Sequence, residues 1–489
     1  MATASKIYRA GTLTYTKGAL ALLCVWLLWG DFCFILMETV VPSIMPLKFH
    51  AIGAPNAIMG WVVTSIPAIL NIALNPVISF KSDRCRSRWG RRIPFIAVTL
   101  PFLLICLVGL GFSDRIGFWL HDYFIGYLGR FSPASVAIFV MGLMMTLFSF
   151  FNTFVNSVFW YLFNDVVPEE LLARFMSWFR MASMGAGAFY SLCVFKYAGT
   201  HSAEILCGVG VLYFLGFGLM CFNVKEGQYP PPEEYVDGQT GVLAAIKTYS
   251  RECLGVSHYW YIFLANVGIV IAYSSATFSV FLNLSLGLNL EMIGRLSFAG
   301  SISTAVAIPI SGWLADRYHP IRIVIGGVIL QVLATPLYLI WLFWQPSPQT
   351  VFYVALTMVI CIGAPIGALI SVIDPVLAMR IYPRERYGQF CSANALTRSL
   401  GAVVAGGLVG VYLDIIAKRF GSNVAYRCLP FWNLAAYLLT LFAVIKLYGS
   451  WKRHGGDAAY VPPGPEDDDS GSAAIMPEPV IVSDAQAKN

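Results

Sequence analysis

Long apolar segments recur along the chain and are separated by short polar connections. Each segment holds about 20 or more mainly apolar residues, enough to cross a hydrocarbon core of about 30 Å at about 1.5 Å rise per residue. Because a spanning segment must satisfy its backbone hydrogen bonds internally, each is predicted to be an α-helix. The twelve predicted helices lie near residues 18–46, 56–80, 92–112, 134–165, 171–198, 203–223, 257–286, 291–314, 321–344, 350–380, 388–417 and 427–449.

The polar segments divide this all-α membrane protein into two halves. Residues 224–256 form the one long polar break, and it separates six helices in 1–223 from six in 257–449. Residues 450–489 are rich in Pro, Ser, Gly and acids, which predicts a disordered cytoplasmic tail.

An internal repeat relates the two halves. Residues 168–177 and 383–392 share Pro, Glu, Phe and Ser at matching places, and the Asp83-Arg84 pair after the second helix corresponds to Asp316-Arg317 after the eighth. Two homologous halves with a site between them are typical of a transporter.

Composition and charge agree with a membrane protein. The chain is 58% hydrophobic and 12% charged, whereas a soluble domain is about 25% charged. Its Lys and Arg residues gather in alternate connections, which by the positive-inside rule places both termini in the cytoplasm. The net charge of +6 is thus explained by topology, and no nucleic-acid partner is expected.

Several further expectations follow from these features. The first apolar segment is too long for a signal-peptide core and is predicted to be a retained signal anchor. The eleven cysteines form no CxxC pair and show no metal-ligand spacing, so neither a cofactor nor a metal is predicted. We expect a multi-pass monomer surrounded by lipid in the plasma membrane, the inner membrane of a bacterium.

The connection at 81–95 packs six Lys or Arg residues and a single acid between two apolar helices. An aspartate at a helix end can accept hydrogen bonds from the N-terminus of a neighbouring helix. Asp83 is expected to face the start of the eleventh helix and Asp316 the start of the fifth, with arginines completing exchangeable ion pairs. The predicted cytoplasmic gate comprises Asp83, Arg84, Gly90, Arg91, Arg92, Asp316 and Arg317. The alternative is a plain positive-inside anchor, which would need neither the acid nor the repeat.

Polar residues inside the helices are the candidate binding groups, because charges in spanning segments are costly and usually face a cavity. In the first half, four helices place polar groups roughly 13–20 Å from the cytoplasmic side. A carboxylate and a guanidinium at one level could hold a polyhydroxylated solute, and a Trp could stack on a sugar ring. The candidate substrate-binding residues are Asp31, Asn71, Asn152, Asn156, Trp160 and Arg180, with Asn266, Tyr273 and Arg398 in the second half.

Structural alternatives exist for these residues. The asparagines could cross-link helices, and Asp31 could form a structural ion pair with Arg180. Asp374 could be neutralised by Arg398 or could take a mobile role, and the sequence does not separate the two. Asp31, Glu38 and Asp374 are the candidates for carrying a coupling proton, and Glu38 is preferred because it lies farther from Arg180.

The loop sequence Ser-Asp-Arg-x4-Trp-Gly-Arg-Arg-x-Pro-Phe at 82–95 resembles the major facilitator superfamily, and more narrowly its glycoside-pentoside-hexuronide cation symporters and the related sucrose transporters. The resemblance implies sugar-binding roles for Asp31, Trp160 and Arg180. It also places the amides Asn71, Asn75 and Asn156 where melibiose-type symporters carry cation-binding acids. Sodium coupling is therefore doubtful, and proton symport or uncoupled transport is expected instead.

The sequence therefore predicts a secondary transporter, not an enzyme, that moves a small polar solute by alternating access, with a sugar or glycoside as the expected class. One alternative is a carrier of another solute, for lysolipid or drug efflux, which predicts an apolar cavity around the aromatic residues of the fourth and seventh helices. A nontransporting membrane receptor or enzyme is the other alternative, and the lack of a soluble domain or nucleophile–base motif argues against it.

Overall fold

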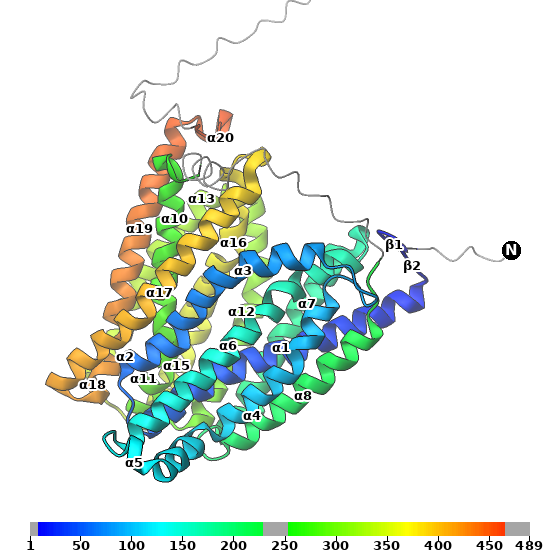
Figure 1. Cartoon of the computed structure of the whole chain (residues 1–489). Helices are drawn as coiled ribbons and strands as arrows, with labels where there is room; N and C mark the ends of the chain where they lie inside the picture. Colours follow the sequence, from blue (N-terminus) through cyan, green and yellow to red (C-terminus); the bar gives the residue numbers. More distant parts are fainter. Residues whose placement is uncertain (1–7, 228–252, 465–489) are drawn as a thin grey trace, which may run out of the picture.

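The computed structural model describes residues 8–227 and 253–464, which are almost entirely helical (Figure 1). The remainder of the predicted linker, 228–252, and of the predicted tail, 465–489, lies outside the described residues. A short antiparallel hairpin, β1 (Tyr8–Ala10) and β2 (Leu13–Tyr15), precedes the helices.

The first half contains six long helical segments, two of which are interrupted by short π or 3₁₀ turns. Its elements are α1 (Lys17–Ala51), α2 (Asn56–Gly60), η1 (Trp61–Ser65), α3 (Ile66–Arg84), α4 (Ile93–Tyr123), α5 (Ile125–Leu128), α6 (Pro133–Val166), α7 (Glu169–Phe189), η2 (Tyr190–Val194), η3 (Phe195–Tyr197) and α8 (Ser202–Asn223).

The second half follows the same plan with more interruptions. Its elements are α10 (Ser257–Tyr273), η4 (Ser274–Phe278), α11 (Ser279–Ser285), α12 (Leu290–Arg317), α13 (Pro320–Ala334), η5 (Thr335–Leu339), α14 (Ile340–Phe343), α15 (Pro348–Met358), η6 (Val359–Gly363), α16 (Ala364–Ile381), η7 (Arg384–Arg386), α17 (Tyr387–Phe420), α18 (Ser422–Arg427), α19 (Leu429–Arg453) and α20 (Gly456–Ala459).

The prediction of an all-helical membrane protein is confirmed. Within the described residues, 11 helices are long and apolar enough to cross a membrane. The predicted fifth span corresponds to α7 with η2 and η3, which carries Arg174 and Arg180 and is not among these 11 helices. It packs against α1 and α12 and completes the twelve-helix bundle.

Local sequence explains how several of these helices begin. Pro133 stands at the first position of α6, where its missing N–H costs nothing, and Ser132 caps the helix by accepting from the Ser135 N–H at 3.2 Å. Ser347 caps α15 in the same way, ahead of Pro348.

The α4 helix is clearly longer than its apolar run predicted. The α4 helix continues to Tyr123 instead of ending near residue 112. Its extra turns are held by Lys48, which donates to the Leu110 carbonyl and to Asp114, and by close packing of Gly117 on Ala137. Polar residues that pair inside the bundle can stay helical beyond the apolar stretch.

The start of the predicted disordered tail, residue 450, also differs from the structure. The α19 helix runs to Arg453, and the chain then packs against the ends of α16 and α13 in the second half. The Tyr460 hydroxyl donates to the Ile381 carbonyl at 3.0 Å, and Asp457 pairs with Arg322. Residues up to 464 therefore belong to the ordered bundle.

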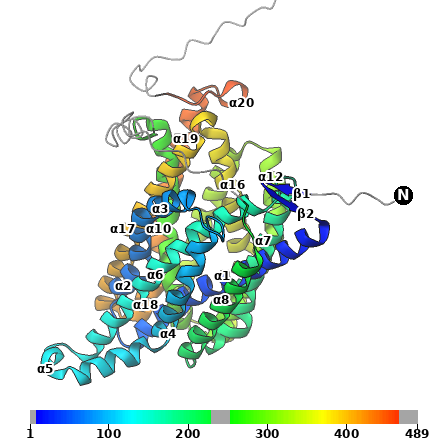
Figure 2. The ribbon, with the colours of Figure 1, turned by 45° about the vertical axis from the view of Figure 1, so that its right-hand side comes forward.

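The two halves meet at one end of the molecule and lie apart at the other. In both views the helices converge near α18, whereas the ends that carry α20 and the β hairpin are separated (Figures 1 and 2). One hydrophobic core runs through the first half and continues into the converging end of the second half. A separate core fills the opposite end of the second half. The hydrogen bonds described between the halves, such as those from Asn56 to Asp414 and from Ser65 to Val403, lie toward the end remote from the Arg-rich loop at 81–95.

Candidate functional site

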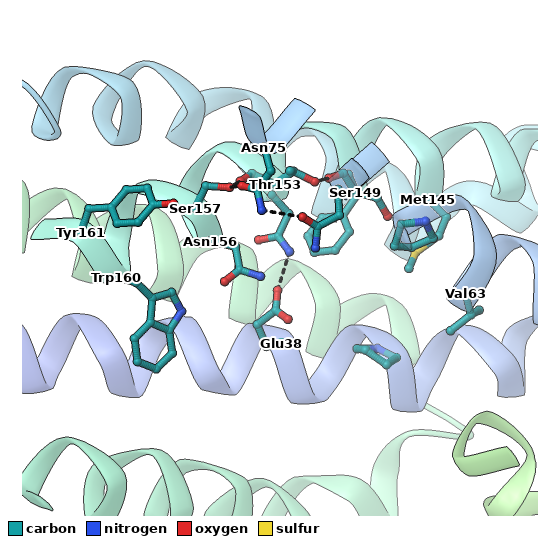
Figure 3. A pocket seen from close by; sticks show the side chains of 15 residues that line it. Glu38, Val63, Asn75, Met145, Ser149, Thr153, Asn156, Ser157, Trp160 and Tyr161 are labelled. Carbon is teal, nitrogen blue, oxygen red and sulfur yellow. Dashed lines mark hydrogen bonds between the residues drawn. The ribbon is translucent and has the colours of Figure 1, made fainter. Parts of the chain in front are cut away.

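A pocket of about 380 Å³ lies inside the first half, between α1, α3 and α6 (Figure 3). It is lined by Glu38 and Pro42 of α1, Val63 of η1, Pro67, Asn71 and Asn75 of α3, and Met145, Phe148, Ser149, Asn152, Thr153, Asn156, Ser157, Trp160 and Tyr161 of α6. Five of the predicted site residues, Glu38, Asn71, Asn152, Asn156 and Trp160, are therefore brought together.

Hydrogen bonds order the side chains of this pocket. The Asn152 amide donates to the Glu38 carboxylate, and this bond is the dashed line that ends on Glu38 in Figure 3. Asn75 Nδ2 donates to Asn71 Oδ1 at 2.7 Å, and Asn75 Oδ1 in turn accepts from the Ser157 hydroxyl. These bonds connect α1 and α3 to α6, so the pocket walls are fixed by the groups that would bind a solute.

The chemistry of the lining is polar with a single acid. Glu38 is the one ionisable carboxylate among the lining residues, and no Lys or Arg is found among them. The amides and hydroxyls offer both donors and acceptors, which suits a neutral polyhydroxylated molecule. Trp160 lies at one end of the pocket with 42% of its surface exposed, so its ring can cover an apolar sugar face.

Asp31 and Arg180 do not line this pocket and do not form the ion pair considered from sequence. Asp31 is fully buried, and its Oδ2 accepts from the Ser183 hydroxyl at 2.7 Å. Its Oδ1 has no hydrogen-bond partner among the described residues. Arg180 is exposed on α7, one turn from Ser183. The sequence placed both groups at one depth but could not show which side chain would meet Asp31.

In the second half, Arg398 pairs with Asp374 at 3.3 Å, which is the structural pairing considered as one alternative. Asn266 donates to Asn394 at 3.1 Å. The cavity beside Asn266 and Asp374 measures only about 20 Å³, too small for a sugar. Tyr273 is 71% exposed and lines none of the pockets described for this chain.

Sequence reasoning missed part of the pocket lining. Ser149, Thr153 and Ser157 follow one another at steps of four along α6, beside the asparagines that the same spacing identified. Tyr161 continues this series, and its hydroxyl lies 3.1 Å from that of Ser79. The four-residue period of hydroxyl side chains was therefore the available signal.

The Arg-rich loop forms ion pairs within the first half. Arg92 pairs with Asp83, and Arg91 and Arg92 both pair with Asp165 at the end of α6. Gly90 has φ +106°, and a Cβ there would lie 2.5 Å from the Glu226 carboxyl carbon. Only glycine fits this turn without strain.

The contacts described for Asp83, Arg84 and Arg317 of the predicted gate lie within their own halves. Asp83 pairs with Arg92 of its own loop instead of facing the start of α17. Arg84 lies over the Phe80 ring at 4.2 Å, and Arg317 over the Trp313 ring at 5.4 Å. The side chain of Asp316 lies outside the described part. The gate therefore stays a prediction.

Glu226, at the start of the polar break, was not predicted to contact this loop. Its carboxylate accepts from the backbone N–H groups of Arg91, Arg92 and Ile93 at 2.9, 2.8 and 2.7 Å. These groups are at the N-terminus of α4, where a carboxylate is favoured by the unpaired donors and the helix dipole.

We expect Glu226→Gln to destabilise the first half by about 1–2 kcal/mol, because the amide keeps one acceptor oxygen and loses the charge at the helix N-terminus. Thermal unfolding of the purified protein in detergent measures the change. Glu204→Gln is the matched control, since Glu204 is exposed in the first turn of α8. Equal melting temperatures for the two variants would contradict the capping role.

At the opposite end, Asp414 of α17 caps the N-terminus of α2. Its carboxylate accepts from the Asn56 N–H at 3.0 Å, the Asn56 amide at 2.8 Å and the Ala57 N–H at 2.9 Å. The Ser65 hydroxyl donates to the Val403 carbonyl at 2.6 Å. Backbones approach closely here, since a Cβ on Gly60 would lie 1.9 Å from the Gly406 oxygen. The halves are therefore locked together at the end remote from the Arg-rich loop.

Comparison with known proteins identifies the family. The sequence profile of the Major Facilitator Superfamily matches residues 27–406. The chain belongs to the major facilitator superfamily. Its members are transporters and not enzymes, and the structure shows their fold. A bacterial homologue of the human lysosomal transporter Spinster, in an inward-facing and unoccupied conformation, superposes with a TM-score of 0.62 at 12% identity, over 88% of this chain and 98% of that one.

Two curated relatives resemble parts of this superfamily member. The sucrose transport protein SUT1 of rice (Oryza sativa subsp. japonica) is 30% identical over 80 residues, which cover 16% of this chain and 15% of the rice protein. Human solute carrier family 45 member 4 is 26% identical over 235 residues, which cover 45% of this chain and 29% of the human protein. The chain thus spans less than a third of either relative.

Proposed function

We propose that this transporter carries a small neutral polyhydroxylated solute, a sugar or a glycoside, and binds it in the first-half pocket. The observation that carries the proposal is the lining of that pocket, where amides, hydroxyls and one carboxylate surround the space and Trp160 closes one end. The partial similarity to a rice sucrose transport protein supports the same solute class.

Proton coupling through Glu38 is the preferred drive. Glu38 is the acid of the pocket and is held by Asn152, so solute and proton would compete for or share the same side chain. Asn71, Asn75 and Asn156 present amide oxygens that carry no charge, and sodium in a low-dielectric site requires charge compensation. Proton symport or uncoupled transport is therefore proposed in place of sodium symport.

Orientation and gating complete the proposal. With both termini in the cytoplasm, the contact of Asp414 with the N-terminus of α2, called here the Asp414 lock, closes the outer side of the transporter. The described conformation is then open toward the cytoplasm. In the opposite conformation, Asp83 and Asp316 would cap the facing helices. The two halves, joined by the 224–256 linker, would rock as a monomer about the fixed site.

The lining of the first-half pocket fits a polar solute better than it fits an apolar solute for efflux. That alternative predicts an aromatic cavity, whereas Phe148 and Trp160 are outnumbered by amide and hydroxyl groups around the pocket.

Uptake into proteoliposomes tests the proposal. A panel of labelled mono- and disaccharides is offered under an imposed pH gradient, an imposed sodium gradient, or none. We expect uptake of at least one sugar, accelerated by an inward proton gradient and indifferent to sodium. Sodium-driven uptake would overturn the coupling, and no uptake of any sugar would overturn the solute class.

The pocket itself is tested with Asn156→Leu, which should lower sugar uptake about fivefold or more through loss of at least one hydrogen bond. Asp31→Asn and Arg180→Ala test the two predicted residues outside the pocket. If both variants take up sugar as wild type does, Asp31 and Arg180 do not belong to the binding site. The proposal that the first-half pocket binds the sugar would be unaffected.

A further inference from the structure

A second polar cavity of about 220 Å³ lies in the second half, between η4 with α11, α13 with η5, and α19. It is lined by Ser275, Ser279, Leu282, Gln331, Thr335, Tyr338, Leu429, Pro430, Asn433 and Tyr437. No side chain of the first half contributes to it. The cavity is therefore separate from the proposed transport site.

Three amide or hydroxyl side chains of this cavity have polar atoms without a hydrogen-bond partner among the described residues, whereas Ser275, Ser279 and Thr335 donate to backbone carbonyls. Asn433 Oδ1 is buried and accepts no hydrogen bond. In the described part of the chain, the side chains of Gln331 and Tyr437 also make no hydrogen bond. Unpaired amides and hydroxyls are costly at membrane depth, where no bulk water can satisfy them. Their presence around a shared space points to a ligand that supplies the missing donors and acceptors.

The lining also defines the charge and size of that ligand. No Asp, Glu, Lys, Arg or His is among the lining residues, so a charged ligand would stay uncompensated. The volume exceeds the share of one water molecule, roughly 30 Å³, several times over. An uncharged group with several hydroxyls fits both conditions.

The surroundings indicate how such a group would arrive. Large apolar side chains next to the cavity are exposed on the outer surface of the same helices, with Leu333 at 65%, Leu337 at 49% and Leu438 at 48%. In a membrane these surfaces face the lipid chains. The cavity lies toward the end of the bundle that carries the Asp414 lock, because η5 ends and α19 begins there.

We propose that this cavity binds the sugar headgroup of a neutral glycolipid, whose acyl chains lie along α13 and α19. Gln331, Asn433 and Tyr437 hydrogen-bond the headgroup hydroxyls, and the exposed leucines contact the chains. This site does not depend on the solute carried by the first-half pocket, and binding to it is measured without transport.

Reconstitution in phosphatidylcholine nanodiscs, with and without glucosyl-diacylglycerol, tests the site, and native mass spectrometry counts the glycolipid that stays bound. Wild type should retain one glycolipid. Asn433→Leu and Gln331→Leu should each bind it about fivefold more weakly, because each removes a hydrogen bond of about 1 kcal/mol. Asn223→Leu, an exposed position at the end of α8, should bind as wild type does.

Equilibrium dialysis with free glucose separates the two sources of the same headgroup chemistry. Glucose binding that Asn433→Leu weakens, without glycolipid binding, would keep the site and assign it to a soluble sugar. Equal glycolipid binding by wild type and both folded leucine variants would overturn the proposal. It would also be overturned if wild type bound neither the glycolipid nor glucose. Loss of sugar uptake alone would overturn only the transport proposal.

Discussion

Replacing Glu38 by Gln is expected to abolish acceleration of sugar uptake by a proton gradient while leaving sugar exchange across the membrane largely intact. Gln keeps the size of the side chain and an oxygen that can accept from Asn152, but it cannot take up or release a proton in the working pH range. Uptake under an imposed pH gradient and counterflow at equal pH, measured on the same proteoliposomes, separate the two effects.

Glu38→Leu should go further and impair exchange as well. It removes the acceptor for the Asn152 amide and leaves that donor unpaired beside the solute, and a hydrogen bond to a charged group contributes about 1.5–3 kcal/mol. We expect solute affinity to fall about 10- to 100-fold. Glu204→Gln, on the surface of α8, is the control for both variants.

If a proton gradient still accelerates sugar uptake by the Glu38→Gln variant, Glu38 is not the residue that carries the coupling proton. The proton would then have to be carried elsewhere, and Asp31, whose Oδ1 lacks a partner, would be the next residue to replace. A variant that shows neither drive nor exchange, yet melts as wild type does, would instead give Glu38 a role in binding.

The hydrophobic pattern predicted the fold because a spanning helix is specified by its own sequence. Length and apolar content are local properties, and the membrane leaves the backbone few alternatives to a helix. Helix ends were predicted less well, as at Tyr123 of α4, because they depend on distant partners such as Lys48.

The candidate site was predicted where periodicity alone decides it. Asn152 and Asn156 lie at four-residue steps on one face of α6, and both reach the pocket. The partner of Asp31 depends on the rotation of α7 against α1, which no spacing within either helix specifies. Asp414 and Glu226 were missed for the same reason, since their partners lie 358 and 135 residues away in sequence.

Adding one methyl group at Gly406 is expected to shift the conformational equilibrium toward the state that is open at the Asp414 end. A Cβ at this position would lie 2.6 Å from Ser65 Oγ and 2.8 Å from Thr64 Cβ, across the contact between α17 and η1. Overpacking of a tight contact costs about 1–3 kcal/mol. Because the cost falls only on the closed arrangement, Gly406→Ala should change the ratio of the two states by about 5- to 150-fold.

Spin labels on Tyr127 and Phe420 measure this shift, because both side chains are exposed at the closed end and belong to different halves. In a background without the native cysteines, Gly406→Ala should add a population with a longer distance between the labels. Gly388→Ala is the matched control, because Gly388 lies on the same helix and a Cβ there would meet nothing within 4 Å.

Asp414→Asn should act in the same direction as Gly406→Ala, because it weakens the cap on α2 without adding bulk. Unchanged distances in both variants would show that the contact between α17 and α2 does not hold this end closed, and the closure would then rest on the packing of α12 against η2, where Gly294 lies close to the Ser191 carbonyl.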